Sequence, residues 1–164
     1  MATVQETLRR YPNSADAYVR LARLQIVSGN IDAAEDPLRN AVRLNPQHVA
    51  AYFMLAGTYF QRDDLSGAET NYRKVVELKP DDAIAYLNIG KCRERQQDTN
   101  GALASYRTAI RYRPNLFEAH LALGELLAKN GDKTGAVEYF KNAILLNPSH
   151  EKAKKLLADM QGGR

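Results

Sequence analysis

A proline that recurs every 34 residues constrains this chain more than any other feature. The series is Pro12, Pro46, Pro80, Pro114 and Pro148. A fixed period of this size is typical of supersecondary units that stack in a row, because one unit alone cannot bury its apolar face. The sequence therefore has to be analysed as repeats before any single residue is interpreted.

Four copies of 34 residues begin at Ala15, Val49, Ala83 and Phe117. Position 8 of each copy is small, position 20 is always alanine, and position 24 is always large. Position 4 holds Tyr18, Tyr52, Tyr86 and His120. Position 24 holds Leu38, Tyr72, Tyr106 and Phe140. Position 27 is compact, as Ala41, Val75, Ala109 and Ala143, and a large position 24 with a compact position 27 suits helices that cross closely.

With these residues aligned, the segment from Ala15 to His150 resembles the tetratricopeptide repeat (TPR) family in its period, small residues, aromatic residues and terminal proline. The resemblance implies an all-α, right-handed α-solenoid of stacked antiparallel helix pairs. In each copy we expect a first helix over about positions 1 to 14 and a second over about positions 18 to 31. The whole chain, 1–164, would form one array of about ten helices without strands, with full repeats at 15–48, 49–82, 83–116 and 117–150.

Partial repeats flank these four copies. Residues 3–12 match the second half of a repeat, and Thr3 with Glu6 forms a capping-box pattern for a short helix. This helix either shields the first repeat or belongs to a longer array that is cut there. Residues 150–161 match a first helix without its partner, so we expect a capping helix that covers the preceding helix with Leu156, Leu157 and Met160.

The breaks inside the repeats also carry local signals. The two helices of a repeat are separated at Gly29–Asn30, Asp63–Asp64, Gln97–Asp98 and Gly131–Asp132. Glycine at the break suits a left-handed helix end, and Gln97 would adopt that conformation at some cost. Ser66 with Glu69 predicts a capping box for the second helix of repeat two. Pro37 lies about five residues beyond a predicted cap at Asp32, so we expect a kink or a late start of that helix.

Composition excludes several classes. No apolar run approaches the roughly 18 residues of a membrane span, and the N-terminus lacks the apolar segment of a secretory signal. We expect a cytoplasmic protein, although a periplasmic or exported one whose signal was cleaved stays open. The single cysteine, Cys92, excludes an internal disulfide, and its position in the repeat predicts a buried structural thiol.

Nothing in the sequence predicts catalysis. It contains no glycine-rich phosphate loop, no Cys or His cluster at metal-ligand spacing and no nucleophile elbow. We therefore expect no enzyme, no cofactor, no metal and no small-molecule substrate. A calculated pI of about 9.2 is compatible with nucleic-acid binding. The repeats lack a regular series of base-contacting side chains, however, and this disfavours nucleic acid as the partner.

The resemblance implies a concave groove lined by the first helices, in which positions 2, 5, 9, 12 and 13 face a bound peptide. The groove residues predicted in this way are Val19, Arg23, Phe53, Phe60, Ile84, Leu87, Lys91, Arg95, Leu121 and Glu125. About half of the apolar positions would pack between neighbouring helices instead. Joint exposure of Phe53, Phe60 and Leu87 would mark an interaction site.

The net charge of +4 is concentrated in the third repeat. This excess is either a solvated face or a surface for an acidic segment. We therefore predict a non-enzymatic protein-binding module or adaptor whose partner is apolar with some acidic residues. The alternatives are a self-assembling structural scaffold and the TPR portion of a larger multidomain protein.

Overall fold

The computed structural model describes residue 6 and residues 9–162, and every regular element in that part of the chain is helical. Residues 11–162 contain nine α-helices, one 3-10 helix and no strand, which confirms the predicted all-α class. The elements are α2 (Ala15–Val27), η1 (Asp32–Ala34), α3 (Glu35–Leu44), α4 (Val49–Gln61), α5 (Leu65–Leu78), α6 (Ala83–Arg95), α7 (Thr99–Tyr112), α8 (Phe117–Lys129), α9 (Lys133–Leu146) and α10 (Glu151–Gly162). The predicted half-repeat, with Thr3 and its capping box, falls largely outside the described residues.

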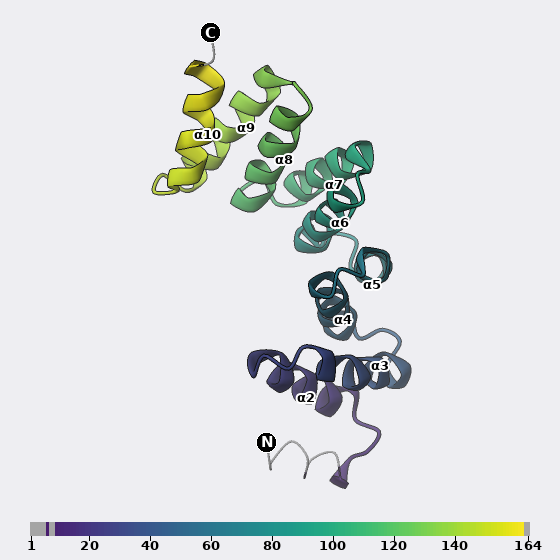
Figure 1. The fold of residues 1–164 in the computed structure, drawn as a ribbon. Helices are drawn as coiled ribbons and strands as arrows, with labels where there is room; N and C mark the ends of the chain where they lie inside the picture. The colour runs from purple at the N-terminus through teal and green to yellow at the C-terminus, as the bar shows by residue number, and fades with distance from the viewer. Residues whose placement is uncertain (1–5, 7–8, 163–164) are drawn as a thin grey trace. The chain divides into compact units, whose positions relative to one another are not determined.

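The chain divides into two compact units, Met1–Pro80 and Asp81–Arg164 (Figure 1). The first contains α2 to α5, and the second contains α6 to α10. Within each repeat the two helices pack on each other and are joined by a short loop, so they run antiparallel. Each unit is thus built from stacked helical pairs, and one continuous array over both units stays a prediction.

The small residue at position 8 makes room for the large residue at position 24. A Cβ atom added to Gly124 would lie 2.7 Å from the Phe140 ring, and one added to Gly90 would collide with the Tyr106 ring. Both rings are fully buried. The paired helices therefore approach closely because backbone, rather than a side chain, faces the aromatic ring.

The loop between paired helices uses a left-handed residue at the same position in all four repeats, which confirms the prediction for Gly29, Gln97 and Gly131 and extends it to Asp63. The φ angles are +80° at Gly29, +65° at Asp63, +65° at Gln97 and +85° at Gly131. Asp63 and Gln97 adopt a conformation that glycine reaches without steric cost. The loop geometry is thus a property of the repeat and does not depend on glycine being present.

The second helices are capped by an aspartate that the sequence analysis overlooked. The Asp64, Asp98 and Asp132 side chains accept a hydrogen bond from the backbone N–H three residues later, at 2.8, 2.9 and 2.9 Å. The prediction of a cap at Ser66 is wrong, because Asp64 is the N-cap of α5. In all three cases the donor is a glycine, and a Cβ atom there would collide with the capping carboxylate.

The second helix of repeat one starts late, as Pro37 predicts. Asn30 and Ala33 replace the capping aspartate and glycine, and the chain forms η1 before α3 begins at Glu35. No side-chain cap stabilises the start of α3, so the predicted cap at Asp32 is wrong. Pro37 is the third residue of α3, where its missing N–H costs no hydrogen bond of the helix.

Helix α10 packs against α9 and closes the second unit. Ala153 is fully buried, and the apolar residues of its inner face lie partly buried against the core of the unit: Leu156, Leu157 and Met160. The helix starts where the His150 Nδ1 atom accepts a hydrogen bond from the Ala153 N–H at 3.1 Å. Cys92 is fully buried, as predicted.

Candidate protein-binding site

The candidate site of the first unit is one face of α4 that carries two phenylalanines. Phe53, Gly57 and Phe60 are spaced four and three residues apart, so they lie on the same side of the helix. Both rings are partly exposed. Phe53 meets the Tyr72 ring of α5 edge to face, with ring centroids 5.3 Å apart and planes inclined by 75°. This contact fixes one ring of the pair on the buried tyrosine below it.

Gly57 leaves the surface between the two rings open. A Cβ atom there would have only the Tyr72 hydroxyl oxygen within 4 Å, at 3.8 Å. Residues seven apart on a helix are separated by about 10 Å along its axis. The two rings therefore flank a strip of bare helix wide enough for one side chain of a partner.

Of the two predicted groove residues on α2, one is an exposed cation and the other is buried. Val19 is only 6% exposed and packs beside Ala41 and Ala51, so it is a core residue. Arg23, one turn further along α2, is exposed and makes no ion pair among the described residues. Of the two α2 residues predicted to contact a partner, only Arg23 is available to one.

In the second unit the apolar groove residues are largely buried. Leu87 is 3% exposed and belongs to the core of the unit, while Ile84 and Leu121 are partly buried against that core. Joint exposure of Phe53, Phe60 and Leu87 is therefore not observed. Apolar anchors on α6 and α8 are limited to the exposed edges of Ile84 and Leu121.

Polar groups on α6 are partly used inside the unit. Lys91 is half-buried and Arg95 is exposed. The Tyr106 hydroxyl of α7 donates a hydrogen bond to Glu94 Oε2 at 2.7 Å. Burial, followed by this hydrogen bond and the negative charge of Glu94, raises the pKa of Tyr106 far above 10. The tyrosine therefore stays a neutral donor and holds Glu94 in place.

Helix α10 adds a residue that the sequence analysis did not place at the site. Lys152 Nζ lies 2.5 Å from Glu125 Oε1 of α8. Position 2 of a repeat is one of the predicted groove positions, and Lys152 occupies it in the partial fifth copy. Extending the repeat numbering to α10 would have found this residue. The pair neutralises the only acidic residue among the ten predicted.

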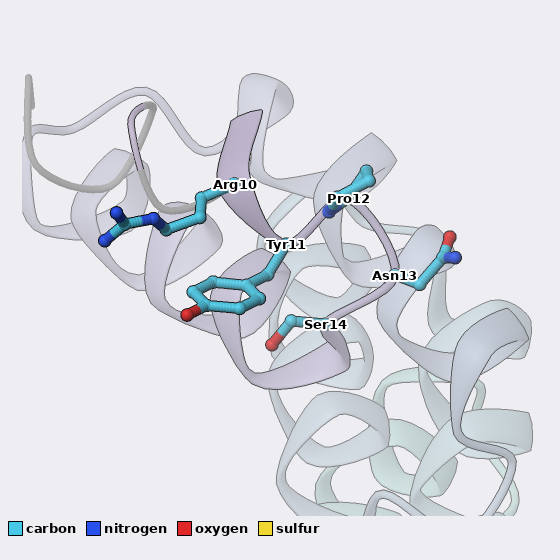
Figure 2. Close-up of a pocket in the computed structure, with 5 residues that line it drawn as sticks. All are labelled: Arg10, Tyr11, Pro12, Asn13 and Ser14. Carbon is cyan, nitrogen blue, oxygen red and sulfur yellow. The ribbon is translucent and has the colours of Figure 1, made fainter.

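A hollow of about 370 Å³ lies beside Arg10, Tyr11, Pro12, Asn13 and Ser14 (Figure 2). Four of these residues, 11–14, form one turn, which is closed by a hydrogen bond from the Ser14 N–H to the Tyr11 carbonyl at 3.1 Å. The Ser14 hydroxyl is already used, because it accepts from the Ala17 N–H at the start of α2. The hollow is therefore the inside of a turn, and its lining residues do not form a binding site of converging polar groups.

Two searches for other kinds of site give negative results over the described residues. No group of three or more His, Cys, Asp or Glu side chains is placed to hold a metal ion. Among the helices of that part of the chain, none is long and apolar enough to cross a membrane. The candidate site on the described surface is therefore one that binds through apolar and charged contacts.

Family models for the tetratricopeptide repeat match residues 2–47, 19–83, 58–109 and 117–150, and a model described as TPR repeat matches residues 92–131. The chain belongs to the tetratricopeptide repeat family. Proteins of this family bind protein partners and are generally non-catalytic, so the chain is a protein-interaction or scaffold module. No curated protein sequence matches it significantly.

Solved structures agree with this fold. A crystal structure of MamA is 24% identical, covers 92% of this chain and 87% of its own, and superposes with a TM-score of 0.84. Pseudomonas aeruginosa PilF is 24% identical over 90% of this chain and 68% of its own, with a TM-score of 0.80. A MamA fragment from Desulfovibrio magneticus RS-1 is 20% identical over 90% and 84%, with a TM-score of 0.83. At these identities the likeness concerns the fold alone.

Proposed function

We propose that the chain is an adaptor that binds an extended segment of a partner protein on the α4 face of its first unit. Phe53 and Phe60 are the apolar anchors, and the strip over Gly57 receives a bulky apolar side chain between them. The observation that carries the proposal is this pair of partly exposed rings on one helix face, with open surface between them. Aromatic residues beside a small pocket are frequent binding hot spots.

Charge narrows the chemistry of the partner. Arg23 on α2 is an exposed cation of the same unit as the α4 face. Cations near an interface raise the association rate of an acidic partner and affect affinity less than buried anchors do. The proposed partner segment therefore combines bulky apolar residues with some acidic ones. The cytoplasmic location of the chain stays a prediction.

The test begins with an affinity pull-down analysed by mass spectrometry, followed by isothermal titration calorimetry with the recovered partner. Phe53→Ala and Phe60→Ala should each weaken binding by more than about 1 kcal/mol. Arg23→Glu should mainly change the salt dependence of binding. The matched control is Ala104→Glu, a change at an exposed site on α7, which should bind like the wild type.

The alternative of a self-assembling scaffold makes a different prediction. If the chain binds copies of itself, light scattering would show a molecular mass that rises with concentration in the absence of any partner. If all three variants stay folded and bind like the wild type, the α4 face does not carry recognition and the proposal is wrong.

A further inference from the structure

The second helix of each repeat presents an exposed row of side chains at positions 22, 25 and 29, here called its outer stripe. In α7 this stripe is Ala104, Arg107 and Arg111, which the spacing of three and four residues places on one side of the helix. The other side of α7 is buried in the core of the second unit with Tyr106 and Ala109. The outer stripe of α7 is therefore exposed along its length, and its charges decide what it can bind.

Position 25 is basic in all four repeats, and the two helices of the first unit neutralise it with a carboxylate of their own. Arg39 of α3 has Glu35 one turn earlier, and its Nη2 atom is 2.7 Å from Glu35 Oε1. Arg73 of α5 has Glu69 one turn earlier, and its Nη1 atom is 3.7 Å from Glu69 Oε1. A glutamate four residues before a cation is a favourable arrangement on a helix. In the first unit the cation at position 25 is thus paired within its own helix.

The two second helices of the second unit differ in this respect. In α9 the cation is Lys141, and Glu138 lies three residues before it on the same exposed side. Helix α7 contains no Asp or Glu, and the residues that correspond to the glutamates of α5 and α9 are Leu103 and Ala104. Arg107 is therefore the one cation at position 25, among the four repeats, whose helix supplies no counter-charge.

The helices that pack on α7, which are α6 and α8, do not neutralise its outer stripe either. Glu94 of α6 accepts a hydrogen bond from a buried tyrosine of α7, and Glu125 of α8 pairs with a lysine of α10. Asp98 is the N-cap of α7, at the opposite end of the helix from Arg111. Glu118, in the first turn of α8, is exposed and forms no ion pair with α7 among the described residues. The counter-charge of the stripe therefore comes from solvent ions or from a partner.

The structure also separates the charges that make the third repeat basic. The Arg93 side chain is used within the repeat, where its Nε atom lies 4.0 Å from Asp98 Oδ2. Arg107, Arg111 and Arg113 are exposed and form no ion pair within the described part of the chain. A cluster of unpaired positive charge thus lies on α7 and at its C-terminal end. Electrostatic complementarity favours an anionic partner for such a cluster.

The helix dipole explains only part of this cluster. Arg111 and Arg113 lie at the C-terminal end of α7, where a cation is favourable, but the effect falls off within the last turn and does not reach Arg107. The guanidinium carbon of Arg111 lies 5.3 Å from the centre of the Tyr112 ring. This contact restricts the arginine before any partner binds. A cation that is already restricted loses less conformational entropy on binding.

We propose that the outer stripe of α7 is a second docking site, which binds an acidic segment of a partner protein through Arg107, Arg111 and Arg113. The partner supplies the carboxylates that this stripe, unlike the other three, lacks in its own helix. Guanidinium groups suit this role, because their planar fork can donate two parallel hydrogen bonds to one carboxylate. The stripe and the α4 face belong to different units, so either proposal can fail alone.

The test is a titration of hexaglutamate into the full chain labelled with ¹⁵N, at low and at high salt, with hexaglutamine as the uncharged control. At low salt the Kd should be on the order of 1 mM, because exposed ion pairs are individually weak. We expect saturable amide shifts concentrated at Arg107, Arg111 and Arg113, and a Kd that rises with salt. Shifts spread evenly over the chain, or equal shifts with hexaglutamine, would overturn the proposal.

A matched pair of variants tests the missing counter-charge itself. Ala104→Glu places a carboxylate three residues before Arg107, as Glu138 precedes Lys141 in α9, and should raise the Kd for hexaglutamate about threefold. Thr70→Glu adds the same charge at the equivalent exposed position of α5 and should leave that Kd unchanged. Equal values for the two variants would show that only the net charge of the chain matters, and would contradict the assignment to α7.

Removal of the arginines gives the larger effect. Arg107→Gln with Arg111→Gln should raise the Kd for hexaglutamate at least about tenfold, whereas Lys133→Gln with Lys141→Gln, which removes two exposed cations of α9, should not. All four side chains are exposed, so circular dichroism should show both variants folded. Hexauridylate is the second probe at the same salt concentration. If it binds the stripe more tightly than hexaglutamate does, the partner is a nucleic acid and the proposal is wrong.

Discussion

The faces of α4 and α6 occupy the same positions of two repeats but differ in what they leave exposed. On α4, positions 9 and 12 are Gly57 and Phe60, so the face is open and apolar. On α6 they are Lys91 and Glu94, and the carboxylate of Glu94 is held by the Tyr106 hydroxyl. The same scaffold therefore supports a face available to a partner and a face whose polar groups are partly engaged within the unit.

The difference between the faces lies in the partner of the buried tyrosine. Tyr72 and Tyr106 occupy the same position and are both buried. Tyr72 meets the edge of Phe53, whereas Tyr106 donates to a carboxylate. The groove side of a repeat is thus apolar or charged according to the residues at positions 9 and 12, which are Gly57 and Phe60 on α4 and Lys91 and Glu94 on α6. Surface chemistry varies here although the buried tyrosine is the same.

The largest expected effect concerns α10, which gives the second unit a cover over α9. Deleting residues 150–164 removes Ala153 and the apolar inner face from the core of the unit. Because each large apolar side chain stabilises by roughly 1.5 to 3 kcal/mol when fully buried and these are partly buried, we expect a loss of roughly 3 kcal/mol. Urea unfolding followed by circular dichroism measures it. An unchanged unfolding curve would mean that α10 does not stabilise the unit.

A smaller effect is expected at Tyr106. Tyr106→Phe removes the donor of Glu94 and should lower the free energy of unfolding by about 1 to 2 kcal/mol at pH 7. Since the folded-state pKa of Tyr106 is raised above 10, its stabilising contribution is complete below pH 10. It is lost as the pH rises further, because the unfolded tyrosine ionises first.

The measurement is urea unfolding of the wild type and Tyr106→Phe between pH 7 and pH 11.5. The stability difference between the two proteins should shrink above pH 10. A difference that is constant over this range would show that Tyr106 ionises equally in both states, and that Glu94 is not held as described.

The smallest effect is expected for the ion pair that links α8 to α10. Both side chains of the Lys152–Glu125 pair are partly exposed, at 63% and 34%, and solvent screens such pairs. A double-mutant cycle of Lys152→Met and Glu125→Gln should give a coupling of about 0.2 to 1 kcal/mol that decreases with salt. A coupling above this range would show that the pair orders α10.

Much of the fold could be predicted because the signals are repeated. The small residue at position 8 and the break between paired helices, which is at Gln97 in the third repeat, occur in all four 34-residue copies. A weak local preference for either feature is therefore supported by its recurrence in the other copies. The capping aspartates show the limit. Asp64 with Gly67 was overlooked in favour of Ser66, although the same Asp and Gly spacing recurs at Asp98 and Asp132.

The candidate site was predicted less completely, because helical periodicity gives the face of a residue and not its exposure. Val19 and Leu87 share positions with Phe53, yet both are buried against neighbouring elements. The contact between Lys152 and Glu125 could be predicted only once the position of α10 relative to α8 was known. The exposure of a residue at a repeat position depends on the volume of the side chains packed around it. The repeat pattern of the sequence gives no information on that packing.

The most direct test of the α4 face is to give it the residues of α6. Gly57→Lys with Phe60→Glu places the residue types of Lys91 and Glu94 on α4, where Gly57 has open space for a side chain and the new carboxylate takes the position that Glu94 has in its own repeat. The measurement is the Kd of this double variant for the recovered partner, by calorimetry, beside the wild type and Ala104→Glu. The account predicts a folded protein whose Kd rises at least about tenfold while the control is unchanged. A folded double variant that binds like the wild type would contradict it.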